Sequence, residues 1–95
     1  MLTFANIKSS VAEVAPLFNV KKVTLFGSYA AGNQTENSDI DLLVEFNEPS
    51  VSLFRIAGIK LKLQEMTGKT VDVIHSPIPA GSLIEVGKEV LIYER

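Results

Sequence analysis

Ile40–Phe46 is the segment that most constrains the fold of this chain, because its composition suits only a β-strand in the middle of the structure. Leu42, Leu43 and Val44 follow one another in it without a polar break. An unbroken apolar run of this length is typical of a strand that is covered on both faces. We therefore expect a central, largely buried strand.

The residues before this strand predict a helix, a strand and a second helix. Apolar side chains recur at helical spacing over residues 7–18, and Pro16 should kink this first helix or end it early. Val23–Phe26 is a short apolar run of strand type, which Gly27-Ser28 interrupts. Small residues follow, and the polar stretch Asn33–Ser38 can only be a loop.

The residues after the central strand predict a third helix, a third strand and a C-terminal piece. The apolar face of this helix should consist of Leu53, Ile56, Ile59, Leu63 and Met66. Ser50 is a suitable N-cap and Gly68 a suitable end. Thr70–Ile74 is rich in β-branched residues and indicates a strand. A weak helix over Ser82–Val86 precedes an apolar tail, Val90–Tyr93, which could complete the core or contact a partner chain.

The composition of the chain limits which metals and partners it can bind. The chain has no cysteine, so disulfides and thiolate metal sites are excluded, and oxygen ligands or His75 favour a hard cation such as Mg²⁺. The net charge of −2 makes DNA or RNA an unfavourable partner, but it does not exclude a small nucleotide. With no apolar run long enough for a signal peptide or a membrane span, we expect a cytoplasmic protein without membrane contact. Residues 1–95 should form a single domain.

Gly27-Ser28 stands between a strand and the beginning of a helix. Such a turn presents backbone N–H groups at a helix N-terminus, where the partial positive charge favours a phosphate group. Glycine lets the backbone approach the ligand closely, and the serine hydroxyl adds a donor. Taken alone, the pair is also compatible with an ordinary turn.

Asp39 and Asp41 lie two residues apart at the start of the central strand, so their side chains point to the same side. Two neighbouring carboxylates repel each other unless a cation lies between them. The alternative is a solvated outer strand face, but the buried character of the strand leaves little room for one.

Asp72 is the only acid within the apolar run of the third strand. It could be an exposed aspartate of an edge strand, or it could converge with Asp39 and Asp41 if the two strands are neighbours. Three converging carboxylates beside a phosphate-binding turn suit two-metal phosphoryl chemistry. Asp39 and Asp41 would hold Mg²⁺, and Asp72 would hold the metal that activates the incoming hydroxyl group.

The segment Gly27–Gly32 followed by Ser38–Val44 resembles the signature of the minimal nucleotidyltransferases, which are small members of the DNA polymerase β-like superfamily. That signature is a glycine-serine pair, ten residues and then Asp-x-Asp. Ten residues, Tyr29–Ser38, separate Ser28 from Asp39 here, and Val71–Ile74 also fits, so the resemblance covers essentially the whole chain.

The resemblance implies an α+β fold, arranged like an α/β sandwich, in which helices flank a small mixed sheet. It also implies that ATP and Mg²⁺ bind at Gly27, Ser28, Asp39, Asp41 and Asp72. Such proteins are often antitoxins encoded beside a HEPN-domain ribonuclease, which they inactivate by transferring AMP to a tyrosine. We therefore expect AMP transfer from ATP to a hydroxyl group of a HEPN-type partner. The oligomeric state stays open.

Ala31 is the one departure, because the family pattern usually has arginine at this position. The alternative function is therefore a catalytically weak or inactive module that neutralises its partner by binding.

A few other residues are open to two interpretations. His75 could face the site, although a loop histidine without a role is the simpler interpretation. Tyr29 could stack on a base or pack inward, and Phe46 and Phe54 should belong to the core.

Overall fold

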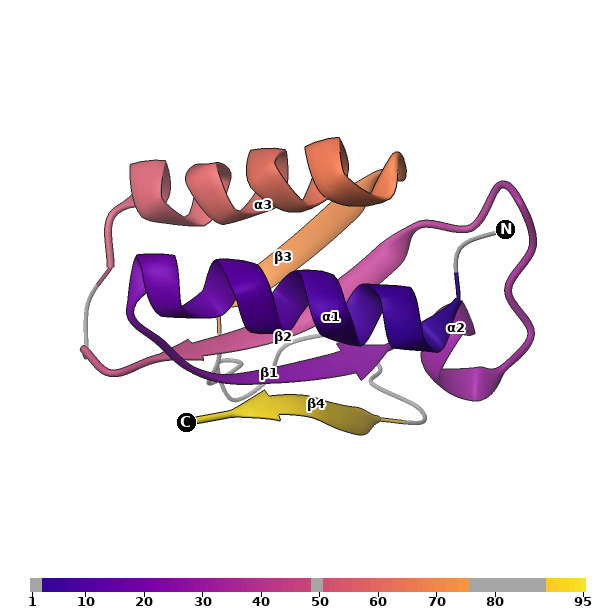
Figure 1. Ribbon diagram of the computed structural model, residues 1–95, viewed down its shortest axis with the longest axis horizontal. Helices are drawn as coiled ribbons and strands as arrows, with labels where there is room; N and C mark the ends of the chain where they lie inside the picture. Colours follow the sequence, from indigo (N-terminus) through magenta and orange to yellow (C-terminus); the bar gives the residue numbers. More distant parts are fainter. Residues whose placement is uncertain (1–2, 49–50, 76–88) are drawn as a thin grey trace, which may run out of the picture.

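A computed structural model describes residues 3–48, 51–75 and 89–95, which form a four-stranded sheet with helices on one face (Figure 1). The helices are α1 (Phe4–Val14), the 3₁₀ helix η1 (Ala15–Phe18), α2 (Ser28–Ala31) and α3 (Leu53–Thr67). The strands are β1 (Val20–Phe26), β2 (Ile40–Phe46), β3 (Val71–His75) and β4 (Val90–Glu94), in the sheet order β3-β2-β1-β4. This order of elements and the flanking helices confirm the expected fold class.

The sheet is mixed, as expected. β1 pairs antiparallel with β2 and with β4, whereas β2 pairs parallel with β3. β2 has a partner on each side, and its residues Leu42 and Val44 are fully buried, so the prediction of a central strand is confirmed. In the described sheet β3 and β4 are the edge strands.

The first helix ends where its proline predicts. Thr3 caps α1, since its side chain accepts a hydrogen bond from the Asn6 N–H group while the Asn6 side chain accepts one from the Thr3 backbone. α1 stops at Val14, and Pro16 lies in η1, because proline has no N–H group to continue the α-helical pattern.

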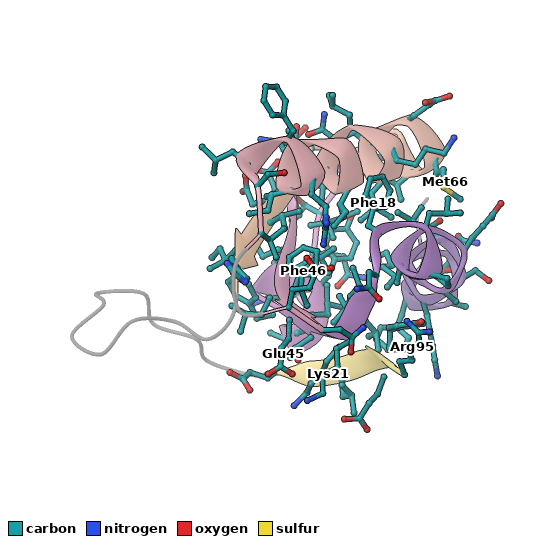
Figure 2. The ribbon with its side chains drawn as sticks, turned by 90° about the vertical axis from the view of Figure 1, so that its left-hand side faces the viewer. Phe18, Lys21, Glu45, Phe46, Met66 and Arg95 are labelled. Atoms are coloured by element: carbon teal, nitrogen blue, oxygen red, sulfur yellow. The ribbon has the colours of Figure 1, made fainter. Side chains whose placement is uncertain are left out.

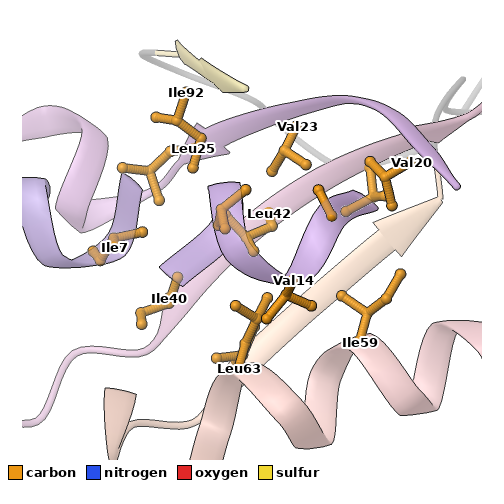
Figure 3. Packing of buried hydrophobic residues seen from close by; sticks show 14 of the residues in the cluster. Ile7, Val14, Val20, Val23, Leu25, Ile40, Leu42, Ile59, Leu63 and Ile92 are labelled. Carbon is orange, nitrogen blue, oxygen red and sulfur yellow. The ribbon is translucent and has the colours of Figure 1, made fainter. Parts of the chain in front are cut away.

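The core lies between the sheet and the paired helices α1 and α3 (Figure 3). Ile7 and Val14 from α1 and Leu63 from α3 pack against Leu42 of β2. From the last strand Ile92 is buried, so the apolar tail completes the core. No helix in the described part of the chain is long and apolar enough to cross a bilayer.

The third helix differs from expectation in its first turn. Its N-cap is Ser52, whose hydroxyl accepts from the Arg55 N–H group at 3.2 Å, and not Ser50, which lies outside the described residues. Leu53, Phe54 and Met66 are 82%, 90% and 37% exposed, so their assignment to the buried side of the helix was wrong. Phe54 precedes the buried Ile59 by five residues, which places it about 140° around the helix from that side chain.

The end of this helix follows the prediction. Gly68 ends α3 with φ 71°, and it allows the chain to turn into β3. The expected helix over Ser82–Val86 lies outside the described residues.

Candidate active site

The Gly27-Ser28 turn joins the end of β1 to α2. Gly27 is the N-cap of α2 with φ 76° and ψ −153°, and its carbonyl accepts from the Ala31 N–H group at 3.0 Å. The N–H groups of the first helical residues have no acceptor within a helix, so they can donate to an anionic ligand. Ser28 is half-buried beside them. The predicted turn is therefore present between a strand and a helix.

Asp41 and Asp72 are direct neighbours in the parallel β2–β3 pair. Both lie on the sheet face opposite to α1 and α3, because Leu42 and Val71 beside them point into the core. Asp41 is half-buried, whereas Asp72 is exposed on the edge strand, so of the two alternatives for Asp72 the edge-strand position is the one observed. The two strands are nevertheless neighbours, which brings Asp72 beside Asp41.

Burial raises the pKa of Asp41 above its ordinary value, and the adjacent Asp72 carboxyl raises it further. Asp39 adds a smaller repulsion in the same direction. These causes all disfavour a negative charge on Asp41. A bound cation would relieve each of them, since carboxylate oxygens are the ligands that hard divalent cations prefer.

The phosphate turn and the acids are in contact through Gly27. A Cβ atom at Gly27 would overlap with Oδ2 of Asp41, so no larger residue fits there without moving the carboxylate. The positive φ also favours glycine at this position. In the sheet register Phe26 is paired with Asp41, which brings the turn over the acid. Sequence reasoning missed this contact, because it depends on how β1 and β2 pair.

Asp39 lies one residue before β2 and is exposed. Among residues 3–48, 51–75 and 89–95 no group of three or more His, Asp and Glu side chains is arranged so that it could hold a metal ion. The donor chemistry fits Mg²⁺, and two of the three acids are already adjacent. A metal site formed by Asp39, Asp41 and Asp72 therefore stays a prediction.

The other candidates lie away from these acids or inside the core. Phe46, which is buried as expected, packs its ring edge-to-face against that of His75, with centroids 5.3 Å apart at the far end of β3. Tyr29 is only 6% exposed, so it packs inward. Ala31 is exposed next to Gly32, so an arginine side chain would have room there.

Comparisons with known proteins, by family profile and by sequence, agree with one another. The profile described as "Nucleotidyltransferase domain" matches residues 6–92. A candidate protein adenylyltransferase of Methanocaldococcus jannaschii is 44% identical over 68 residues, which are 72% of each chain. The protein adenylyltransferase MntA of Thermococcus cleftensis is 34% identical over 96 residues, which cover 96% of each chain.

Two solved structures resemble the fold at lower identity. A chain of a toxin–antitoxin crystallised with AMP-PNP superposes with a TM-score of 0.78 at 20% identity, over 93% of this chain and 73% of that one. A chain from a tri-AMPylated HEPN toxin of Shewanella oneidensis in complex with its MNT antitoxin superposes with a TM-score of 0.69 at 15% identity, over 94% and 71%. At these identities the two likenesses concern the fold alone.

Proposed function

This chain belongs to the nucleotidyltransferase domain family, and from that premise we propose that it transfers AMP from Mg²⁺-bound ATP to a hydroxyl group of a partner protein. The hydroxyl oxygen attacks the α-phosphorus, the bond from that phosphorus to the β-phosphate oxygen breaks, and pyrophosphate leaves. The hydroxyl proton passes to a carboxylate of the site or to water. Relatives named as protein adenylyltransferases support this class of acceptor.

One observation carries the proposal: the Gly27 turn touches Asp41, which stands next to Asp72. This contact supports a site in which N–H groups of the turn would bind a triphosphate beside a pair of acids that resist carrying two negative charges. Gly27 and Ser28 would bind phosphate oxygens through their backbone and hydroxyl groups. Such donors orient the α-phosphorus, and orientation supplies much of the rate enhancement in phosphoryl transfer.

Asp39, Asp41 and Asp72 would hold Mg²⁺, which supplies positive charge to neutralise the phosphate oxygens. Asp72 is the more exposed of the two paired acids, because it lies on the edge strand. We therefore assign it to the side from which the acceptor hydroxyl approaches. A reaction that consumes ATP and needs Mg²⁺ also favours action in the cytoplasm.

We propose a HEPN-domain toxin, encoded next to this chain, as the acceptor protein. The support is that a chain with this fold occurs in a complex of a tri-AMPylated HEPN toxin with an MNT antitoxin, and that a relative in sequence is named protein adenylyltransferase MntA. The described residues make up a small sheet and its helices, and none of them forms a second domain that could hold an acceptor. A hydroxyl acceptor on a separate protein fits the small size of this described fold.

Ala31 supports a second candidate, a module that neutralises its partner by binding with little or no transfer. A guanidinium group at this position could make charge-assisted bonds to phosphate oxygens, and alanine cannot. The two functions differ in one observable property, which is whether the partner gains a covalent nucleotide.

The test is to incubate the chain with the purified neighbouring HEPN protein, Mg²⁺ and ATP that carries the label on the α- or on the γ-phosphate. Transfer of AMP labels the partner from α-labelled ATP only, and the intact mass of the partner rises by one or more AMP groups. Asp41→Asn should abolish labelling, while Glu45→Gln, a matched change on the same face of β2, should not.

Two results would contradict the proposal. Labelling from γ-labelled ATP would indicate a kinase. An unlabelled partner that still elutes as a complex with this chain would favour the binding module.

A further inference from the structure

Asp39 has no strand pairing of its own to hold it. It precedes β2, whose first ladder bond runs from the Ile40 N–H group to the Thr70 carbonyl at 2.9 Å. Its position therefore depends on the loop that leads into it from α2. A ligand carboxylate at the end of a free loop would lose conformational entropy each time a cation bound.

The end of that loop is closed into a turn by its own residues. The Ser38 N–H group donates to the Thr35 carbonyl at 3.1 Å, and the Thr35 N–H group donates to Ser38 Oγ at 2.8 Å. The Asn37 N–H group also donates to Thr35 Oγ1 at 3.3 Å. These bonds shape the turn, but they do not attach it to the rest of the molecule.

Lys69 makes that attachment. Its ammonium group donates to the carbonyl of Glu36, within the turn. Between described residues, this is the only hydrogen bond from segment 34–38 to another element. Lys69 is half-buried and follows Gly68, which ends α3 in the left-handed conformation and directs the chain back toward β2.

The same link, Lys69-Thr70, thus holds the chain on both sides of Asp39. Thr70 fixes Ile40 after it, and Lys69 fixes Glu36 before it. We propose that Lys69 is a positioning residue, which holds Asp39 where its carboxylate can join Asp41 and Asp72 around a cation. This inference rests on the metal-dependent activity proposed above. Groups that hydrogen-bond a metal ligand directly change metal affinity by about 10- to 100-fold, and Lys69, which bonds the backbone three residues before Asp39, should have an effect at the lower end of this range.

The experiment measures binding of Mn²⁺ to the protein with AMP-PNP, from the electron paramagnetic resonance signal of free Mn²⁺. Lys69→Met should weaken binding by about tenfold. Lys69→Arg, which keeps a charged donor, should restore affinity to near that of the wild type. Lys62→Met is the matched control, because Lys62 is an exposed lysine of α3, and it should change nothing.

A double-mutant cycle separates positioning from general stability. In an Asp39→Asn background, Lys69→Met should cost little further affinity, because the carboxylate that it positions is gone. An equal cost with and without that carboxylate would overturn the inference, and so would a Lys69→Arg variant as weak as Lys69→Met. A wild-type protein that binds no Mn²⁺ with AMP-PNP would overturn the proposed function as well, whereas equal binding by Lys69→Met and Lys62→Met would overturn this inference alone.

Discussion

Asp41→Asn should make the metal-free protein more stable while it removes the activity. The substitution keeps the shape of a half-buried side chain and removes a charge that stands beside the Asp72 carboxylate. Two unit charges about 4 Å apart repel by about 1 kcal/mol in water and about 4 kcal/mol near a protein surface. Because Asp72 is exposed, we take the lower figure. About 1 kcal/mol corresponds to a rise in melting temperature of about 4–8 °C for a domain of this size.

The gain in stability from Asp41→Asn should be larger at neutral than at acidic pH. Burial and Asp72 raise the pKa of Asp41 above its ordinary value of 3.8, so the folded chain binds this proton more tightly than the unfolded chain does. Stability then falls as pH rises from 3.8 through the raised pKa of the folded state, and this contribution is absent in the asparagine variant. The advantage of Asp41→Asn should therefore be full at neutral pH and shrink as the solution is acidified.

The assay is urea unfolding in EDTA at neutral and at acidic pH, with Glu45→Gln as the control. Glu45 lies on the same strand and face, but it is paired in register with Lys22 instead of with another acid. Its neutralisation should not stabilise the protein. If Asp41→Asn were no more stable than the wild type at neutral pH, repulsion between the two acids would not be a cost of folding. With Mg²⁺ and ATP the wild type should become more stable than Asp41→Asn, because a cation can bind to the Asp41 carboxylate.

Three further predictions test other parts of the structure. Gly27→Ala should cost about 1–3 kcal/mol of strain and displace the Asp41 carboxylate, so the variant should lose AMP transfer. Gly32→Ala is the control, because Gly32 has a similar φ of +80° but no atom within 4 Å of the new Cβ. The difference in urea midpoint between the two variants therefore measures the collision with Asp41. Ala31→Arg should raise kcat/KM for AMP transfer by about ten- to a hundred-fold, as expected for one charge-assisted bond; unchanged kinetics with an already fast wild type would show that this position does not limit the reaction. Phe54→Ala should change the free energy of unfolding by less than about 0.5 kcal/mol, since the ring is 90% exposed, whereas Phe46→Ala should cost about 3–5 kcal/mol; equal losses would show that Phe54 is buried in solution.

The sequence predicted the fold well where one pattern allowed one interpretation. The apolar run Leu42–Val44 can only be central, and Pro16 can only interrupt a helix, so both predictions were confirmed. The α3 helix was harder, because apolar residues occur all around it: Leu53, Phe54, Ile56, Ala57, Ile59, Leu61, Leu63 and Met66. Such a helix has no single apolar arc, and packing against the sheet and α1 decides which residues are buried (Figure 2).

The site was predictable to the extent that it depends on alternation along a strand. The same-side placement of Asp41 and Asp72 follows from alternation once the two strands are neighbours. The contact between Gly27 and Asp41 depends on the antiparallel register of β1 with β2, which no local pattern specifies. Lys69 gave no signal at all, because a lysine after a helix-ending glycine is also typical of a solvated surface.

The acids and the core use opposite faces of the same strands, and this arrangement affects how such a protein can diverge. Leu42 and Val71 hold the sheet to its helices, whereas Asp41 and Asp72 stand side by side on the reverse face, where they add nothing to the core. One substitution on that reverse face could therefore silence the enzyme and leave a well-folded chain with its surfaces intact. Over evolutionary time, only selection for nucleotide transfer itself would retain the acids, and a silenced copy could persist as an inert partner of the same protein.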